Sequence, residues 1–563
     1  MKLFILLLFL FLLPAMPGSA QNIEQIVNDD EPTFDLSGGI RAGMNYHYSN
    51  RRRVRSPWGY NLSARVNFKI KSFNFPFRVY YRDARFSFSR PFLTFSASPS
   101  YKWITVHLGR RSMDFGQYVF SGRTFNGVGV ELRPGNFRFK TMYGKLFTLD
   151  QQVDSLIFGA SLFPAYDRNA MALQLGFDNG KNSFYVTGFR ARDDINSISE
   201  AEREINPFPA RENVAASIEG TVSLFSFIRW ETEGAVSLFS HNQEAERTFV
   251  DSSIIKRFNQ IYNINNSSRL HYAGHSSLGL YFRSFSISAR YKRVSPFYQT
   301  AGLYNIQDDI QNITGNISMR LFRNRFNANF RAGLNQDNLT DLKTQSRQNL
   351  LIHAIINIKL SRRLSVGANI NNNNFELKNN LIGVNDTIIV AQNMQTQSFN
   401  LRYSWKSEKD VRHSINANFN HNSFESILPQ EARITPTVLT TYGGRYSIKP
   451  SKNPWSGTFG LNAQTIDQQE ETKRFSSTLS ARYQKEDARL SLSSKVSFSY
   501  QTRNGNSDGT IIRTSLNASY SLGEQIRAYS SFQYLTRNTT ISASLNRFFI
   551  NAGVQAQFKS IKK

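Results

Sequence analysis

Asn61-Leu62-Ser63-Ala64-Arg65-Val66-Asn67-Phe68-Lys69-Ile70 is the stretch of sequence that indicates the fold most directly. Apolar residues occupy every second position from Leu62 to Ile70, and polar residues fill the positions between them. Successive side chains of a β-strand point to opposite faces. The stretch is therefore predicted to be a strand with one apolar and one polar face.

The same alternation recurs along the chain, for example over residues 285–292, 401–406 and 489–498. Between Thr33 and Phe558 we count about 26 candidate strands, most of about 9 to 14 residues, joined alternately by short turns and long loops. This pattern is typical of outer-membrane barrels. The sequence predicts an all-β chain forming a single transmembrane antiparallel β-barrel of about 26 strands (range roughly 22 to 26), with short periplasmic turns and long extracellular loops.

A set of soluble β-sandwich domains is the alternative fold, because sandwiches also alternate. Sandwich cores are expected to be rich in Val, Ile and Leu, and linkers should separate the domains. Here the apolar face is rich in Phe, Tyr, Leu and Ala, and no Pro/Gly/Ser-rich linker divides the chain. A mean hydropathy of -0.42 fits a barrel whose second face is wet. The barrel is therefore favoured, with short helices expected in the long loops at residues 199–205 and 249–262.

The N-terminus indicates export. Lys2 precedes an apolar run from Leu3 to Leu13, and the small residues Gly18-Ser19-Ala20 follow it. These are the parts of a secretory signal peptide, with cleavage expected after Ala20. The apolar run is shorter than the roughly 20 residues of a membrane-spanning helix, which argues against an uncleaved anchor. We expect a signal peptide at 1–20, a flexible periplasmic lead-in at 21–32, the outer-membrane barrel at 33–558 and a basic tail at 559–563.

The amino-acid composition excludes several kinds of site and favours one kind of partner. The 563 residues include no Cys, which excludes disulfides, thiolate zinc sites and cysteine nucleophiles. The formal charge of +27 favours an anionic partner, and export makes nucleic acid an improbable one. Outer-membrane lipid and lipopolysaccharide are candidate partners, and a turn that carries Arg51, Arg52, Arg53 and Arg55 is expected to contact lipid phosphates.

The polar face of each strand must line the lumen, because lipid cannot solvate polar groups. This assignment makes the lumen strongly cationic, with Glu131 as its clearest acid. The expected lumen-lining anion contacts are Arg65, Lys69, Arg138, Lys140, Arg290, Lys292, Arg331, Arg402, Lys406, Arg482, Arg489, Lys495 and Arg527. A basic lumen concentrates anions. The alternative interpretation is that these charges only keep a large barrel hydrated and are partly balanced by acidic loops.

Residues 107–144 interrupt the uniform pattern. A strand ending in Gly109-Arg110 precedes a Gly/aromatic loop, and the strand Asn126-Gly127-Val128-Gly129-Val130 follows it. This region resembles porin-like and polysaccharide-export barrels of Gram-negative outer membranes, and its continuation to Gly144 is similar to large outer-membrane barrels of the Bacteroidota. The resemblance implies that the loop from Ser112 to Phe125 folds inward as a constriction near Arg110, Arg111 and Arg123. An ordinary extracellular loop is the alternative.

No sequence motif nominates an enzyme. The chain lacks H-E-x-x-H, G-x-x-x-x-G-K-[ST] and G-x-S-x-G. The histidine pairs His271/His275 and His413/His421 lie too far apart along predicted strands to share a metal, so no metal or cofactor is expected. We therefore expect a channel or export conduit for anionic solutes or acidic polysaccharide. The alternative is a non-transporting barrel subunit of a secretion or outer-membrane assembly complex, with other envelope proteins as partners.

Overall fold

The computed structural model describes residues 34–51, 57–82, 92–146, 166–247, 262, 264–379, 388–427, 436–451, 453–485, 489–523, 525–540 and 544–558. The expected signal peptide, lead-in and basic tail lie outside these residues, as do Arg52, Arg53 and Arg55. The helix expected at 249–262 also lies outside them, except for Tyr262. Among the helices of the described segments, none is both long enough and apolar enough to cross a bilayer.

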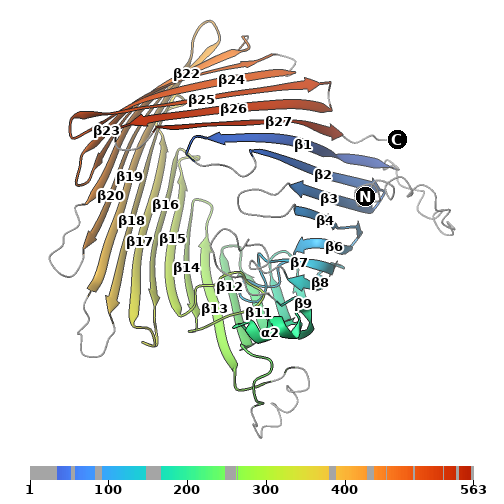
Figure 1. Ribbon diagram of the computed structural model, residues 1–563. Coiled ribbons are helices and arrows are strands. Elements are labelled where there is room, and N and C mark those ends of the chain that lie inside the picture. The colour runs from blue at the N-terminus through green and yellow to red at the C-terminus, as the bar shows by residue number, and fades with distance from the viewer. Residues whose placement is uncertain are drawn as a thin grey trace.

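Strands dominate the described chain (Figure 1). In chain order they are β1 (Asp35–Ser49), β2 (Trp58–Ile70), β3 (Phe73–Arg82), β4 (Phe92–Ala97), β5 (Ser100–Tyr101), β6 (Ile104–Ser112), β7 (Thr124–Leu132), β8 (Phe137–Leu146), β9 (Arg168–Asp178), β10 (Ser183–Asp193), β11 (Glu212–Leu224), β12 (Ile228–Ser240), β13 (Ser268–Tyr281), β14 (Phe285–Val294), β15 (Ile310–Leu321), β16 (Phe326–Asp337), β17 (Gln345–Lys359), β18 (Leu364–Asn379), β19 (Ile388–Lys406), β20 (Val411–Ile427), β21 (Thr437–Pro450), β22 (Trp455–Asp467), β23 (Thr472–Gln484), β24 (Leu490–Arg503), β25 (Asn506–Leu522), β26 (Ile526–Thr539) and β27 (Leu545–Phe558).

The strands form one closed antiparallel barrel. Each strand pairs with its chain neighbours, and β1 pairs with β27 from Gly38↔Phe558 to Ser49↔Arg547, which closes the sheet. The short β4 and β5 share one position, because both pair with β3 on one side and with β6 on the other. The wall therefore has 26 positions, which confirms the predicted fold class.

The two faces of the wall follow the sequence alternation. On β2, the side chains of Leu62, Phe68 and Ile70 are exposed on the outer face. Arg65 and Lys69 belong to the opposite set, which lines the lumen. This arrangement places apolar atoms against lipid and leaves polar atoms in water.

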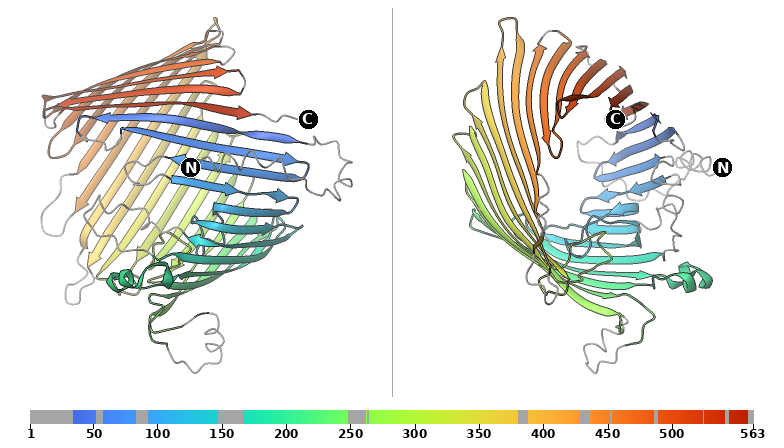
Figure 2. Two further views of the ribbon diagram at one scale, coloured as in Figure 1. Left: turned by 45° about the vertical axis from the view of Figure 1, so that its right-hand side comes forward. Right: turned by 60° about the vertical axis from the view of Figure 1, so that its left-hand side comes forward.

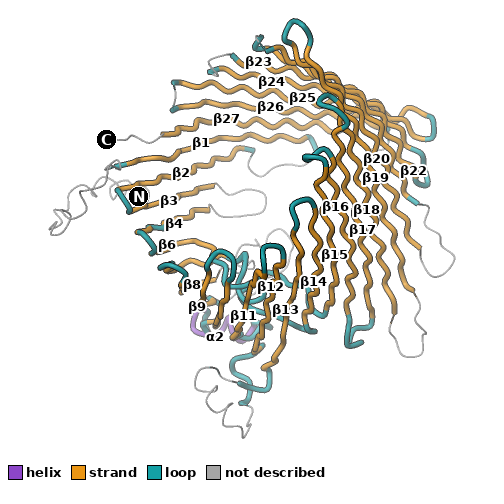
Figure 3. Tube along the Cα trace, turned by 180° about the vertical axis from the view of Figure 1, so that it is seen from behind, coloured by secondary structure: helices purple, strands orange, loops and turns teal. Residues whose placement is uncertain are grey.

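The barrel is uneven around its circumference (Figures 1 and 2). Strands β17 to β20 have 15 to 19 residues, whereas β6 to β10 have 9 to 11. Short turns such as residues 71–72 lie at one rim, where β1 begins and β27 ends (Figure 3). The long loop at 194–211 carries a 3-10 turn (Ile195–Ser197) and α2 (Glu200–Ile205). Ser199 caps α2 in a reciprocal capping box with Glu202, so the helix expected at 199–205 is confirmed.

Candidate functional site

The lumen is the candidate site, and the strand registers show where the predicted cations lie. All of them except Arg489 lie on the strand face opposite the exposed apolar side chains; Arg489 precedes β24, in a turn. Glu131, the expected inward acid, pairs with Arg133 and lies 3.3 Å from His107 Nε2. Glu219, Glu231 and Glu233 share this inner face, so one sector of the wall is more acidic than the sequence analysis expected. Contact of the cations with anions remains a prediction.

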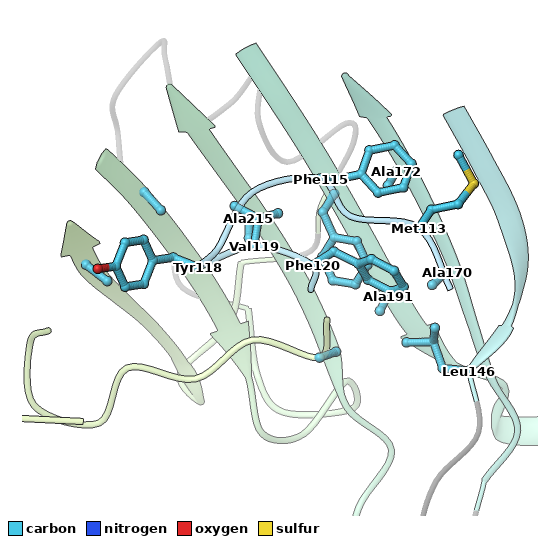
Figure 4. Packing of buried hydrophobic residues seen from close by; sticks show 14 of the residues in the cluster. Met113, Phe115, Tyr118, Val119, Phe120, Leu146, Ala170, Ala172, Ala191 and Ala215 are labelled. Atoms are coloured by element: carbon cyan, nitrogen blue, oxygen red, sulfur yellow. The ribbon is translucent and has the colours of Figure 1, made fainter. Parts of the chain in front are cut away.

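The loop between β6 and β7, residues 113–123, folds into the barrel. Phe115, Tyr118, Val119 and Phe120 are fully buried there. Their side chains pack on small inner-face residues of the wall, which leave room for a second layer of chain (Figure 4). These small residues are Ala170, Ala172, Ala191, Ala215, Ala235 and Ala273.

Gly116 and Glu233 fix the middle of this loop. Gly116 has φ +107°, and a Cβ at this position would lie 2.9 Å from Glu233 Oε1 and 3.0 Å from Ser217 Oγ. The backbone N–H of Tyr118 donates to Glu233 Oε1 at 3.2 Å. Only glycine allows this approach without strain, because other residues rarely adopt this φ. Glu233 therefore anchors the loop.

Three of the predicted lumen cations contact the β6–β7 loop. Arg290 Nη2 donates to Gln117 Oε1 at 3.0 Å, and Lys140 Nζ donates to the carbonyl of Asp114 at 3.3 Å. Lys292 Nζ lies 5.8 Å from the centre of the Tyr118 ring, within range of a cation–π contact. These three cations hold the loop to the wall instead of facing an open lumen.

A second segment, the β14–β15 loop at residues 295–309, also folds inward and is hydrogen bonded to the β6–β7 loop. Tyr298 Oη donates to the carbonyl of Tyr118 at 2.8 Å, and Thr300 Oγ1 donates to the carbonyl of Val119 at 3.1 Å. Arg123 Nη1 donates to the carbonyl of Ala301 at 2.7 Å and to that of Leu303 at 3.1 Å. The sequence pattern did not predict this contact. The only available signal was the loss of alternation over these residues.

Asn213 joins the second loop to the wall. Its side chain is 1% exposed. Nδ2 donates to Ser237 Oγ at 2.8 Å and to the carbonyl of Leu238 at 3.0 Å. Oδ1 accepts from the Ala301 N–H at 2.9 Å, and Thr300 Oγ1 lies 3.1 Å from it. One buried amide thus satisfies groups on β12 and on the β14–β15 loop.

The three arginines of the expected constriction lie at the end of β6 and in the β6–β7 loop. Arg111 pairs across from Phe125 and Arg110 pairs across from Asn126, and Arg123 Cζ lies 5.0 Å from the centre of the Tyr304 ring. Arg123 is 6% exposed, because it lies between the two inward loops. Burial lowers its pKa to about 10, so it still carries its charge at neutral pH. Whether the paired loops constrict passage remains a prediction.

The histidines have hydrogen-bonding roles within the wall. His275 Nδ1 lies 3.2 Å from Tyr118 Oη, His413 Nδ1 lies 2.7 Å from Tyr446 Oη, and His421 Nδ1 lies 3.1 Å from Thr440 Oγ1. Across the described segments, no group of three or more potential side-chain metal ligands comes together.

A closed antiparallel barrel with an apolar outside and a polar inside has the architecture of an outer-membrane β-barrel. No family model matches the chain, and no curated protein matches it.

Solved structures share the architecture at 9 to 11% identity. The P pilus usher PapC translocation pore gives a TM-score of 0.38 over 93% of this chain and 100% of its own, at 9% identity. A ferric enterobactin receptor (PfeA) mutant of Pseudomonas aeruginosa gives 0.40 over 92% and 80%, also at 9%. A BenF-like porin of Pseudomonas fluorescens Pf-5 gives 0.30 over 70% and 100%, at 11% identity. These similarities carry no argument about function.

Proposed function

We propose that this chain is an outer-membrane channel or export conduit whose lumen favours anionic solutes, including acidic polysaccharide. The observation that supports this proposal is the charge on the inner face of β16 to β23. Arg331, Arg402 and Arg445 are exposed on this face, and none forms an ion pair with a described residue. Neighbouring inner positions carry amides and hydroxyls, such as Asn329, Asn416 and Ser447, that keep the surface wet.

Unpaired cations on low-dielectric walls concentrate anions and exclude cations. In the sector from β7 to β14, Lys140, Arg290 and Lys292 instead contact the β6–β7 loop, and inner glutamates add negative charge. The two sectors therefore differ, and β16 to β23 form the expected anion path. We also propose that the chain is related to the large outer-membrane barrels of the Bacteroidota and that it associates with lipopolysaccharide.

Replacing Arg331, Arg402 and Arg445 together with glutamine should reduce anion over cation permeability severalfold, because it removes three unpaired lumen charges. The measurement is the reversal potential of single channels in planar bilayers under a salt gradient. Arg323→Gln is the matched control, since Arg323 lies in the short turn between β15 and β16 and is exposed outside the strands. A wild-type barrel that conducts with cation selectivity, or a folded barrel that never conducts, would overturn the proposal.

A second candidate function is a barrel subunit of a secretion or assembly complex. Stacked phenylalanines at the short-turn rim favour it: the ring centres of Phe225 and Phe227 lie 5.8 Å apart, and those of Phe227 and Phe282 lie 5.3 Å apart. Phe225 is 80% exposed. Exposed apolar patches often mark contacts with other proteins. If the folded barrel does not conduct ions in planar bilayers, this second function becomes the leading candidate.

A further inference from the structure

A cavity of about 550 Å³ opens on the inner face of β24 to β27 and β1. Cations and hydroxyl or amide groups line it: Lys495, Arg513, Arg547, Ser497, Ser515 and Gln533. Arg513 and Arg547 were not among the lumen contacts expected from the sequence. The cavity faces the lumen, because these side chains lie opposite the exposed Val496, Leu516 and Val554.

The strand register brings the three cations together. Leu535 pairs with Arg513 on one side and with Arg547 on the other, so the two arginines flank one residue. With strands about 4.8 Å apart, their backbones lie about 10 Å from each other. Lys495 pairs with Ser515, the next inner-face residue after Arg513 on β25. Long side chains at these spacings can converge on one ligand of a few ångströms.

No described carboxylate balances this cluster. Neither a side-chain hydrogen bond nor an ion pair joins Lys495, Arg513 or Arg547 to a residue that the structure describes. Arg537, on the inner face of β26 beside Arg513, has a buried Nε with no acceptor among the described residues. Like charges on neighbouring strands repel, and buried donors normally find an acceptor. Both observations favour an anionic ligand at this cluster.

We propose that this cavity binds the phosphate group of a small anionic solute in the lumen. Arginine forks match phosphate oxygens in pairs, and Lys495 adds a point charge. Ser497, Ser515 and Gln533 can hydrogen bond to hydroxyls of the same solute, while Leu535 and Phe549 offer apolar contact to its carbon skeleton. The proposal rests on the proposed function and names the ligand class and the residues of one binding site within it.

The test is calorimetric titration of inorganic pyrophosphate into the full-length, detergent-folded barrel, purified free of lipopolysaccharide. The double variant Arg513→Gln/Arg547→Gln should weaken binding at least 10-fold, and Lys495→Gln alone should weaken it less. Arg323→Gln is the matched control, because it removes an exposed charge from the short turn between β15 and β16, outside the lumen wall, and should leave pyrophosphate binding unchanged. Resistance to unfolding at elevated temperature during gel electrophoresis verifies that each variant is folded.

The outcomes separate this site from the proposed function. Undiminished pyrophosphate binding by the folded double variant would overturn the site, even if the channel is anion-selective. Loss of binding in that variant supports the site, whether or not the barrel conducts. If lipopolysaccharide displaces pyrophosphate from the wild-type barrel, the phosphate source is a lipid headgroup, which overturns the assignment to a lumen solute.

Discussion

Truncating Phe120 to alanine should lower the free energy of unfolding by about 3–5 kcal/mol, the usual cost of emptying the space of a buried phenylalanine. The Phe120 side chain is fully buried. Its ring centre lies 5.9 Å from that of Phe115 and 5.5 Å from that of Phe189. Because these rings join the β6–β7 loop to the wall, the cavity would form where the loop is held. Unfolding in urea, followed by tryptophan fluorescence in detergent, measures the loss.

Phe208→Ala is the control for this substitution. Phe208 is 56% exposed in the loop before β11, so the same truncation should cost well under 1 kcal/mol there. Equal destabilisation by the two variants would show that Phe120 is not packed against the wall. The Phe120 variant should also give noisier single-channel currents, because a loosened loop moves within the lumen.

The fold could be predicted because the membrane imposes a simple pattern. Lipid accepts only apolar side chains, so residues 61–70 and the strands like them had to alternate. Closure followed from the same pattern, although the sequence could not show that β4 and β5 share one position. Their combined eight residues lie on either side of Ser98-Pro99, where the strand is interrupted.

The sequence could predict which side chains of the candidate site face the lumen, but not which groups they contact. Alternation assigns a face, so it placed Arg290 and Lys292 in the lumen correctly. It does not assign a partner, and both residues contact the β6–β7 loop. Contacts such as Thr300 with Asn213 join positions far apart in the chain without any periodic signal. The cluster of Arg513 and Arg547 became apparent only when the register placed both beside Leu535.

Replacing Asn213 with leucine should lower the free energy of unfolding by about 2–4 kcal/mol and release the β14–β15 loop. Leucine has a similar size but no polar atoms, so the Ala301 N–H loses its buried acceptor and Ser237 Oγ loses the donor supplied by Nδ2. Each such unsatisfied group costs about 1–3 kcal/mol. Urea unfolding measures the loss, and hydrogen exchange of residues 295–309 reports the release of the loop.

Asn329→Leu is the matched control, because Asn329 is only partly buried in the open lumen, where water can replace its bonds to Asn316 and Ser318. The combination of Asn213→Leu with Phe120→Ala then tests whether the two loops act as one unit. Since Tyr298 and Thr300 connect them, losing either anchor should already loosen both, and the double variant should cost less than the sum of the single variants. Strict additivity would mean that the loops are held independently, so that opening one leaves the other folded against the wall.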